Sequence, residues 1–294
     1  MITITIASGK GGAGKTSITA ALAAWLKTTA VAADCDVDAA NTAIALGATI
    51  RTTDDYWSGD GYSIDPARCA DCGRCAEVCR FGAIQRLTGQ LHIDEALCER
   101  CAACQDVCPA GAVVAAPKRG GSLSVSATDC GSILVHAKLI PGEDTSGKLV
   151  RAVRLRAEAV ATALPGARYI LVDAPPGIGC PVIAALSGAD LAVVVVEAGQ
   201  SGIRDARRLY ELLAGMKRRT VCVVNKAGLA PQMDRLARDL AAEFGSPVVA
   251  SLPFDKRFRR ATEGGKAWVD SRDPEIRASA MELCAGLLEA AKDC

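Results

Sequence analysis

The chain has 294 residues, of which 50% are hydrophobic and 23% charged, and 34 Lys and Arg against 33 Asp and Glu leave a formal charge of +1. A chain this apolar and this close to neutrality can bury enough surface to fold, which excludes an intrinsically disordered protein. The small net charge also argues against a strong overall attraction to nucleic acid or to an anionic membrane. The unusual number is 14 cysteines, eight of which fall between Cys69 and Cys108.

The first residues predict a strand rather than a targeting segment. Residues 2–7 alternate between apolar and hydroxyl-bearing side chains, without a basic region or a cleavage site, so we expect no signal peptide. The longest apolar runs, such as 191–196, are far shorter than the roughly 18–20 residues needed to cross a bilayer. We therefore expect a cytoplasmic protein, in which clustered cysteines more often bind metal than form disulfides.

Short apolar runs alternate with longer helical patterns at both ends of the chain. Strands are predicted at residues 2–7, 31–34, 169–173, 192–197, 220–225 and 248–251. Helices are predicted between and after them, at residues 16–28, 149–164, 181–187, 202–216, 232–244 and about 274–291. This alternation predicts an α/β fold with a mostly parallel sheet that is covered by helices on both faces.

The middle of the chain breaks this rhythm. Two similar units lie between about Tyr62 and Pro117, and each consists of C-x-x-C-x-x-C-x-x-x-C followed by Gly-Ala and an apolar residue. Segments rich in Gly, Asp and Ser at 54–61 and 118–122 have the composition of joints around an inserted module, and a hairpin at 123–127 and 132–139 is expected after it. We therefore divide the chain into a first part at 1–60, a small α+β insertion at 61–117 and a second part at 118–294.

A complete phosphate-binding motif lies between the first strand and the first helix. G-x-x-x-x-G-K-[ST] is formed by Gly9, Lys10, Gly11, Gly12, Ala13, Gly14, Lys15 and Thr16, and Ser17 follows it. Glycines let backbone N–H groups surround a phosphate, and the helix N-terminus adds partial positive charge. Lys15 can neutralise phosphate oxygens and the Thr16 hydroxyl can bind Mg²⁺. A plain glycine-rich turn is the alternative.

Lys10, the second lysine of this loop, makes it a deviant P-loop. The sequence S-G-K-G-G-A-G-K-T resembles that of the MinD, ParA, Mrp and nitrogenase iron-protein class of P-loop ATPases. In that class the extra lysine reaches across a dimer to the nucleotide of the partner. The resemblance therefore implies a nucleotide-dependent homodimer, or a heterodimer with a related ATPase. A solvated lysine on a loop is the plainer alternative.

Two further segments resemble the switches of this class. Asp36 and Asp38 follow the second strand, and the resemblance implies that Asp36 orients the attacking water, with Asp38 as a second candidate. Either carboxylate could instead cap the next helix. Asp173 begins D-A-P-P-G after a buried strand and is expected to hold a water of Mg²⁺, while the N–H of Gly177 is expected to sense the γ-phosphate.

The residues after two later strands favour adenine over guanine. Asn225 and Lys226 stand where GTPases carry N-K-x-D, but Gly228 occupies the place of the carboxylate that reads guanine. Asn225 is the expected contact to adenine. Three residues after the next strand resemble the adenine-side loop of the class, namely Pro253, Phe254 and Asp255. The expected ligand is ATP with Mg²⁺.

The eight clustered cysteines have the spacing of a bacterial ferredoxin with two clusters. They form two runs, Cys69, Cys72, Cys75 and Cys79, and then Cys98, Cys101, Cys104 and Cys108. Because the fourth cysteine of each run binds the other cluster, Cys108 is predicted to complete the first [4Fe–4S] cluster and Cys79 the second. Structural zinc sites use two separated C-x-x-C pairs, so the spacing favours iron–sulfur over zinc.

The other six cysteines lie outside these runs. Cys35, Cys222 and Cys284 lie in apolar patterns and are predicted to be core residues. Cys180 directly follows the second switch and could bind a metal or cluster shared by two chains, although a buried residue at a helix start is the plainer interpretation. Cys130 is a weaker candidate of the same kind.

The whole chain resembles MinD-superfamily ATPases that carry an inserted ferredoxin domain, and the linking segments 140–150 and 175–181 share in the resemblance. The leading hypothesis is an ATPase that couples its nucleotide state to electron transfer through two [4Fe–4S] clusters to a redox partner. Cluster assembly or delivery to an acceptor protein, as by Mrp-type carriers, and a MinD- or ParA-like positioning role are the alternatives. Residues 281–294 offer only Lys292 as a cation, which argues against membrane attachment. Basic runs at 217–219 and 256–260 are more typical of solvated faces than of a DNA-binding surface.

Overall fold

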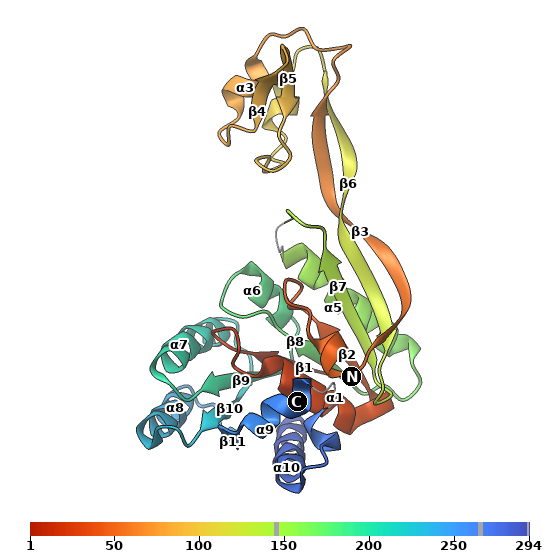
Figure 1. Cartoon of the computed structure of the whole chain (residues 1–294). Helices are drawn as coiled ribbons and strands as arrows, with labels where there is room; N and C mark the ends of the chain where they lie inside the picture. The colour runs from red at the N-terminus through yellow and green to blue at the C-terminus, as the bar shows by residue number, and fades with distance from the viewer. Residues whose placement is uncertain (144–146, 264–266, 293) are drawn as a thin grey trace. The chain divides into compact units, whose positions relative to one another are not determined.

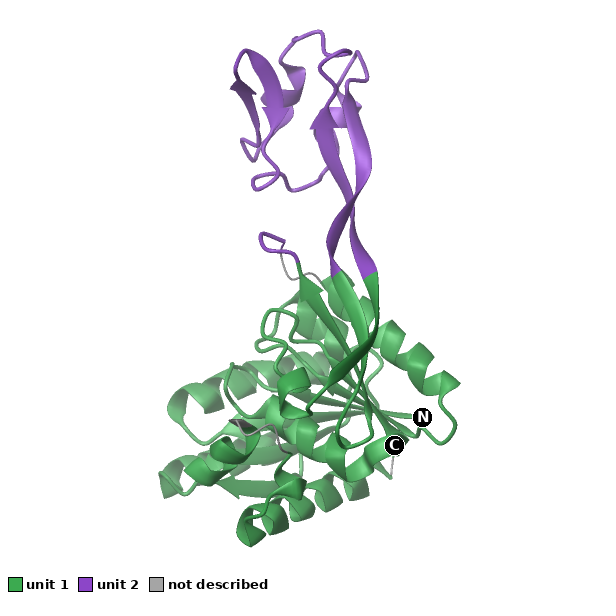
Figure 2. Ribbon diagram, turned by 45° about the vertical axis from the view of Figure 1, so that its right-hand side comes forward, with its two compact units in different colours: residues 1–54, 122–139, 145–294 green, residues 55–121, 140–144 purple. Residues whose placement is uncertain are grey.

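The structure, a computed structural model, describes residues 1–143, 147–263, 267–292 and 294. These residues form two compact units, which Figure 2 colours separately. Unit 1 consists of the described residues of 1–54, 122–139 and 145–294, and unit 2 of those of 55–121 and 140–144. Unit 2 contains the whole of the predicted insertion, whose identity as a ferredoxin-like domain stays a prediction. Residues 144–146 of the linking segment and residue 293 lie outside the described residues.

The described residues form a sheet of nine strands in the order β11-β10-β9-β1-β8-β2-β7-β6-β3 (Figure 1). From β11 to β7, every neighbouring pair of strands is parallel. These strands are β1 (Ile2–Ala7), β2 (Ala30–Asp34), β7 (Ile133–Leu139), β8 (Tyr169–Asp173), β9 (Leu191–Glu197), β10 (Thr220–Ala227) and β11 (Val248–Pro253). The predicted α/β fold with a mostly parallel sheet is confirmed.

Helices cover both faces of this sheet. One face packs against α1 (Lys15–Leu26) and α10 (Pro274–Ala291), and the side chains of Val193 and Val195 belong to that core. Since side chains alternate along a strand, Val194 and Val196 face the opposite side, where α7 (Gln200–Gly215) packs on β9. The other helices of unit 1 are α2 (Thr42–Ala45), α5 (Gly147–Ala163), α6 (Cys180–Leu186), α8 (Pro231–Glu243) and α9 (Lys256–Glu263).

The predicted helices and strands of the two terminal parts are confirmed to within two residues at each end, except that the strand expected at 123–127 already begins at Val113. The start of α10 shows how the local sequence determines where a helix begins. Asp273 precedes it and its carboxylate accepts hydrogen bonds from the N–H groups of Glu275 and Ile276, while Pro274 occupies the first turn. None of the helices in the described parts of the chain is long and apolar enough to cross a membrane.

The expected joints of the insertion are strands. β3 (Thr49–Ile64) and β6 (Val113–Ala127) run through both of the segments rich in Gly, Asp and Ser. Within unit 1 the hydroxyls of Thr53 and Ser124 are 2.9 Å apart, and within unit 2 the Ser58 hydroxyl is 3.4 Å from the carbonyl oxygen of Lys118. Gly120 allows the close approach, since a Cβ there would overlap Ser58. Pairing with the opposite strand therefore overrides the turn-forming composition.

Unit 2 is built around a small core that contains cysteines. Its hairpin consists of the antiparallel strands β4 (Ile84–Leu87) and β5 (Gln90–Ile93), and its short helices are α3 (Arg74–Val78) and α4 (Ala103–Asp106). Cys75 is buried together with Ile84, Ile93 and Val113. Four more cysteines pack against this core while partly exposed, namely Cys79, Cys98, Cys104 and Cys108.

Candidate functional site

The phosphate-binding motif forms the turn between β1 and α1, as the sequence predicts. Gly12 and Gly14 have φ angles of 73° and 104°, the left-handed region that glycine adopts most readily. Gly9 packs so tightly that a Cβ would overlap the backbone carbonyl of Asp205 at α7. The glycines of the motif therefore shape the loop and allow it to lie against its neighbours.

Two cavities of unit 1 border this loop and share Gly12, Gly14, Ser17 and Thr262 in their walls. The first is also lined by residues of β10, of α9 and of the segment from the end of β11 to α9, among them Asn225, Lys226, Pro253, Phe254 and Asp255. The second is also lined by residues of the loop and of both predicted switches, among them Gly11, Lys15, Thr16, Asp36, Asp38 and Pro175. The structure thus brings most of the predicted nucleotide-binding residues to adjoining cavities. Five of the predicted residues are not among the described residues that line either cavity, namely Gly9, Lys10, Ala13, Asp173 and Gly177.

Lys15 is buried at the second cavity, where it meets a residue that the sequence analysis missed. Its ammonium is 3.1 Å from Ser8 Oγ, and the Ser8 hydroxyl donates to the carbonyl oxygen of Lys10. Burial lowers the pKa of Lys15, while the nearby carboxylates of Asp173 and Asp36 oppose that shift. A buried cation at the start of a helix is suited to binding phosphate.

Asp173, at the end of β8, is fully buried and uses its two oxygens differently. Oδ2 accepts hydrogen bonds from the hydroxyls of Thr16, at 2.7 Å, and Thr42, at 3.1 Å. Oδ1 is buried and has no hydrogen-bond partner among the described residues. Burial raises the pKa of Asp173 to about 6, against the opposing effects of Thr16 and Lys15. A free carboxylate oxygen beside a hydroxyl is the type of donor set that Mg²⁺ prefers, so these residues fit the predicted ion.

Asp34 organises the segment after β2, a role that the sequence analysis missed. Its carboxylate accepts hydrogen bonds from the N–H groups of Asp36 and Thr42. Burial and the neighbouring charge of Asp173 raise the pKa of Asp34 well above its usual range. Asp36 and Asp38 lie in the segment held by Asp34, and burial also raises the pKa of Asp36.

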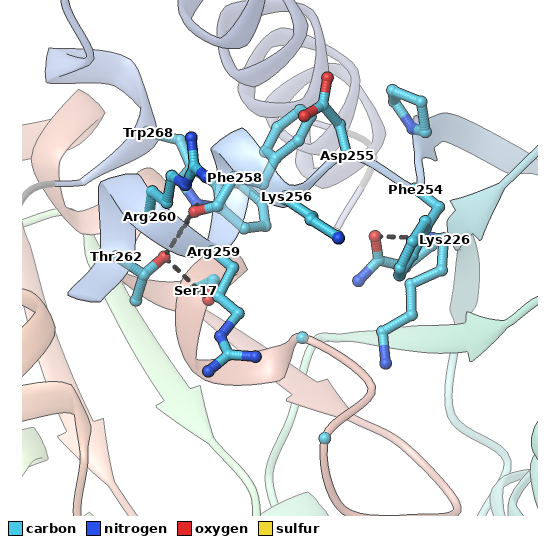
Figure 3. Close-up of a pocket in the computed structure, with 14 residues that line it drawn as sticks. Ser17, Lys226, Phe254, Asp255, Lys256, Phe258, Arg259, Arg260, Thr262 and Trp268 are labelled. Atoms are coloured by element: carbon cyan, nitrogen blue, oxygen red, sulfur yellow. Dashed lines mark hydrogen bonds between the residues drawn. The ribbon is translucent and has the colours of Figure 1, made fainter.

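The first cavity has a volume of about 590 Å³, within the range of small-molecule sites. Figure 3 shows Lys226 and Phe254 on one side of it and Lys256 and Arg259 of α9 on the other. The side chain of Asn225 is already engaged, because its amide donates to the carbonyl oxygen of Ala13 and its oxygen accepts from the N–H of Lys226. Asn225 therefore ties the P-loop to the end of β10, in addition to its predicted contact with adenine.

Phe258 and Thr262 of α9 line the first cavity together with Trp268, a cluster that was not anticipated from the sequence. The rings of Phe258 and Trp268 meet edge to face with centroids 4.9 Å apart. The Trp268 indole N–H donates to the carbonyl oxygen of Phe258 and to the hydroxyl of Thr262. Thr262 is in turn 3.4 Å from the hydroxyl of Ser17 on α1. No local motif marks these residues, since they meet only through the fold.

Lys10 of the loop forms an ion pair with Glu197 at the end of β9. The Lys10 ammonium is 2.9 Å from Glu197 Oε1 and 3.2 Å from the Ser201 hydroxyl. The other oxygen of Glu197 is 2.9 Å from the ammonium of Lys226. Although burial raises the pKa of Glu197, the two lysines hold it below its usual range.

Gly177 and Cys180 are the two predicted site residues that follow Asp173 after β8. The N–H of Gly177 donates to the carbonyl oxygen of Ser8, so it is already bonded. Cys180 begins α6 as expected, but it is exposed, so the expectation of a buried residue at this position is wrong. Gly179 and Pro181 on either side of it line the second cavity. The buried positions of Cys35, Cys222 and Cys284 confirm them as core residues.

Most of the cysteines of unit 2 lie close to other cysteines. Cys79, Cys98, Cys101 and Cys104 line one cavity, although Cys79 comes from the first run and the others from the second. Burial raises the pKa of Cys75, and the neighbouring thiols of Cys108 and Cys69 add to that shift. Hydrogen bonds from backbone N–H groups, led by that of Val113, lower the pKa of Cys108.

No group of three or more His, Cys, Asp or Glu side chains among the described residues converges in a geometry that would hold a single metal ion. A cubane makes a different demand, because each of its four cysteines binds a different iron atom. The ligand sets themselves stay predictions.

Comparison with known proteins shows the family of the chain. The family described as the CobQ/CobB/MinD/ParA nucleotide binding domain matches residues 4–268. The uncharacterized protein MJ0578 of Methanocaldococcus jannaschii is 36% identical over 228 residues, which are 77% of this chain and 78% of that protein.

Solved structures share the fold at low identity. The MinD cell division protein of Aquifex aeolicus is 21% identical, with a TM-score of 0.58 over 98% of both chains. MinD of Pyrococcus horikoshii in complex with Mg-ADP is 17% identical, with a TM-score of 0.57 over 97% of this chain and 95% of that one. The chain belongs to the CobQ/CobB/MinD/ParA family of nucleotide-binding proteins.

Proposed function

We propose that the chain is a Mg²⁺-dependent ATPase of the MinD/ParA type. The observation that carries this proposal is the buried Asp173, whose free Oδ1 lies on the carboxylate that Thr16 binds, close to the ammonium of Lys15. Mg²⁺ bound there would neutralise phosphate charge. Relatives with the same fold support the nucleotide, since MinD of Pyrococcus horikoshii was solved with Mg-ADP and Cyanothece McdA(D38A) with ATP.

In this proposal the residues of the second cavity hold the triphosphate. Lys15 and the N–H groups of the loop bind phosphate oxygens, and Thr16 with Asp173 holds Mg²⁺. Asp36 orients the attacking water, with Asp38 as the second candidate. Gly177 would sense the γ-phosphate only after its N–H leaves the carbonyl oxygen of Ser8.

The first cavity is the proposed site of adenine. Its polar wall includes Asn225 and Lys226, and the loop at Pro253, Phe254 and Asp255 closes its β11 side. Phe254 is half exposed and offers an aromatic face to a base.

Hydrolysis of Mg-ATP by the full chain tests this proposal. Lys15→Met removes the buried cation and is expected to lower kcat/KM by about a hundredfold or more. Lys217→Met changes a lysine outside the two cavity walls and serves as the matched control, with unchanged hydrolysis expected. Equal rates for the wild type and Lys15→Met would contradict the proposed site.

A second function is favoured by the cysteines of unit 2. We infer that unit 2 holds two [4Fe–4S] clusters and that the nucleotide state governs electron transfer from them to a redox partner. The supporting observation is that Cys79 lines the same cavity as Cys98, Cys101 and Cys104, which is the crossed grouping that two-cluster ferredoxins require. Delivery of a cluster to an acceptor protein, and a positioning role without clusters, are the competing functions.

Iron analysis after anaerobic purification tests whether unit 2 holds the two clusters. The wild type is expected to contain about eight irons, and Cys104→Ser about four, because each cubane holds four. Cys294→Ser alters an exposed thiol outside unit 2 and is the matched control, for which about eight irons are expected. Bound zinc, or a wild type without iron, would contradict the cluster assignment.

The family also suggests a nucleotide-dependent dimer. MinD of Aquifex aeolicus was solved in complex with MinC, so at least one relative has a protein partner. In a homodimer, or a heterodimer with a related ATPase, Lys10 would reach the nucleotide of the other subunit. Cys180 is exposed beside the second cavity and remains the proposed ligand of any shared metal or cluster.

A further inference from the structure

The first cavity, the proposed site of adenine, has a strongly cationic wall. Its basic side chains are those of Lys226, Lys256, Arg259 and Arg260, and Asp255 is the one carboxylate among the described residues that line it. The adenine and the ribose of ATP carry no charge, and the proposed place of the triphosphate is the second cavity. The wall of the first cavity is therefore more positive than a neutral base requires.

Asp255 is already bound to a residue outside this wall. Its carboxylate accepts hydrogen bonds from the backbone N–H and the side-chain Nε of Arg257, both at 2.8 Å. These contacts lower the pKa of Asp255, and the nearby charge of Arg260 adds a smaller contribution. The negative charge of Asp255 is therefore engaged mainly by Arg257 and does not offset the whole cationic wall.

The two lysines of the wall differ in their partners. The ammonium of Lys226 is 2.9 Å from Glu197 Oε2, and the other oxygen of Glu197 binds Lys10. The side chain of Lys256, by contrast, has no ion pair or hydrogen bond among the described residues, and Figure 3 shows its ammonium directed from α9 toward the side where Lys226 and Phe254 lie. Lys256 therefore presents an uncompensated charge to the cavity.

Part of the same wall is apolar. Phe258 and Trp268 line the cavity and are only 7% and 4% exposed. Apolar walls lower the local dielectric constant, so cations beside them attract an anion more strongly than cations on an open surface do. Phosphate oxygens are the acceptors that lysine and arginine commonly bind through charge-assisted hydrogen bonds. The cavity thus has the charge and the walls of a phosphate site.

We propose that the first cavity binds a phosphate group in addition to the triphosphate chain, with Lys256 as its main ligand. This deepens the proposed function and rests on it, because adenine is placed in the same cavity. Two sources supply such a group. One is a nucleotide phosphorylated on the 2′ or the 3′ hydroxyl of its ribose, and the other is a free phosphate ion bound beside the base.

Competition against a fluorescent ATP analogue on the full chain tests the first source. ADP phosphorylated on the 2′ or the 3′ hydroxyl is expected to displace the analogue at about three- to tenfold lower concentration than ADP, the scale of one charge-assisted contact. This preference should disappear in Lys256→Gln, whereas Lys256→Arg keeps the charge and should keep most of the preference. Lys217→Gln changes a lysine outside both cavity walls and is the matched control, for which the full preference is expected.

Inorganic phosphate tests the second source. If the free ion is the ligand, millimolar phosphate should tighten the binding of ADP by about threefold in the wild type and leave it unchanged in Lys256→Gln. The dependence on Lys256 separates this effect from phosphate that binds at the P-loop, where Lys15 is the cation.

The absence of both effects in a wild type that binds ADP would overturn the proposal. An effect that persists in full in Lys256→Gln would also overturn it, as would an equal loss of affinity for every competitor, because Lys256 would then contact the part that all of them share. If Lys256→Gln unfolds at a clearly lower temperature, the wild type provides the second measurement. Its phosphate effect should shrink at high salt, and an effect independent of salt would contradict the proposal. A wild type that binds neither ADP nor the analogue would instead overturn the proposed ATPase function.

Discussion

Asp173 shows how one side chain links the fold to the proposed chemistry. Its Oδ2 satisfies two hydroxyls from α1 and α2, whereas its Oδ1 is buried without a hydrogen bond among the described residues. A buried carboxylate oxygen without a partner is costly for the fold. The cost is understandable if the oxygen is kept free for Mg²⁺.

Asp173→Asn is therefore expected to separate stability from activity. The amide oxygen can still accept from Thr16 and Thr42, so the fold should persist, but hydrolysis of Mg-ATP should fall by about a hundredfold. Steady-state kinetics with Mg²⁺ measure this loss. Asp239→Asn on the exposed side of α8 is the control. Full activity of Asp173→Asn would contradict the assignment.

The stability of Asp173→Asn should also depend on pH in a defined direction. Burial raises the pKa of Asp173 to about 6, so the folded state favours the protonated form and the charged form destabilises it. Without nucleotide, Asn should stabilise the fold relative to Asp at about pH 8, and this advantage should shrink as the pH falls through about 6. Thermal unfolding of both proteins across this range measures it, and an advantage that grows at low pH would be inconsistent with the raised pKa.

Glu143 in unit 2 is a second carboxylate with little exposure to solvent, and it is held by ion pairs. Its side chain is only 6% exposed and is paired with Arg100, which stands between Cys98 and Cys101, and with Lys118 of β6. Removing one partner of a buried carboxylate costs more than removing an exposed pair, because the remaining charge is left poorly solvated.

Arg100→Met is expected to destabilise unit 2 by about 1–3 kcal/mol. Arg86→Met is the matched control, because Arg86 pairs with Asp71 in the same unit but their side chains are 49% and 53% exposed. That exposed pair should contribute no more than about 1 kcal/mol. Thermal unfolding measures both, and equal losses would show that burial does not determine the value of these pairs.

At the scale of elements, the junction between β9 and α7 places Glu197 beside the P-loop. Gly202→Ala would drive a Cβ into the Glu197 carbonyl oxygen, whereas Gly215→Ala at the other end of α7 meets nothing within 4 Å. Overpacking should cost Gly202→Ala about 1–3 kcal/mol. The better helix propensity should give Gly215→Ala up to about 1 kcal/mol of added stability. Denaturant unfolding measures the contrast, and similar values for both would argue against close packing at this junction.

The same elements show how far local sequence determines the fold. β8 and α10 could be predicted closely because apolar runs and a capping Asp-Pro pair mark their ends. β3 and β6 could not, since their Gly, Asp and Ser residues favour turns and only cross-strand pairing makes them strands. The nucleotide motif was predictable because its residues are consecutive. Glu197 was missed because its partner Lys10 is distant in the sequence, whereas the contacts of Ser8 with Lys15 and of Asp34 with Thr42 form only when the segments around them fold.

At the scale of the whole molecule, one chain combines a MinD/ParA-type nucleotide-binding unit with a unit rich in cysteine. The family match covers residues 4–268, whereas the spacing of eight cysteines and the grouping of four of them around one cavity support the proposed clusters of the second unit. Their presence in one polypeptide is the reason to expect that ATP governs iron–sulfur chemistry here.

The reoxidation rate of the reduced clusters tests most directly whether the two units work together. The anaerobically purified full chain would be reduced and then mixed with an electron acceptor, with Mg-ATP, with Mg-ADP or without nucleotide. The rate is expected to depend on Mg-ATP in the wild type and to be independent of it in Lys15→Met, which retains the clusters but lacks the phosphate-binding cation. Identical rates under all three conditions, together with transfer of iron and sulfur to an apoprotein, would contradict ATP-governed electron transfer and favour cluster delivery.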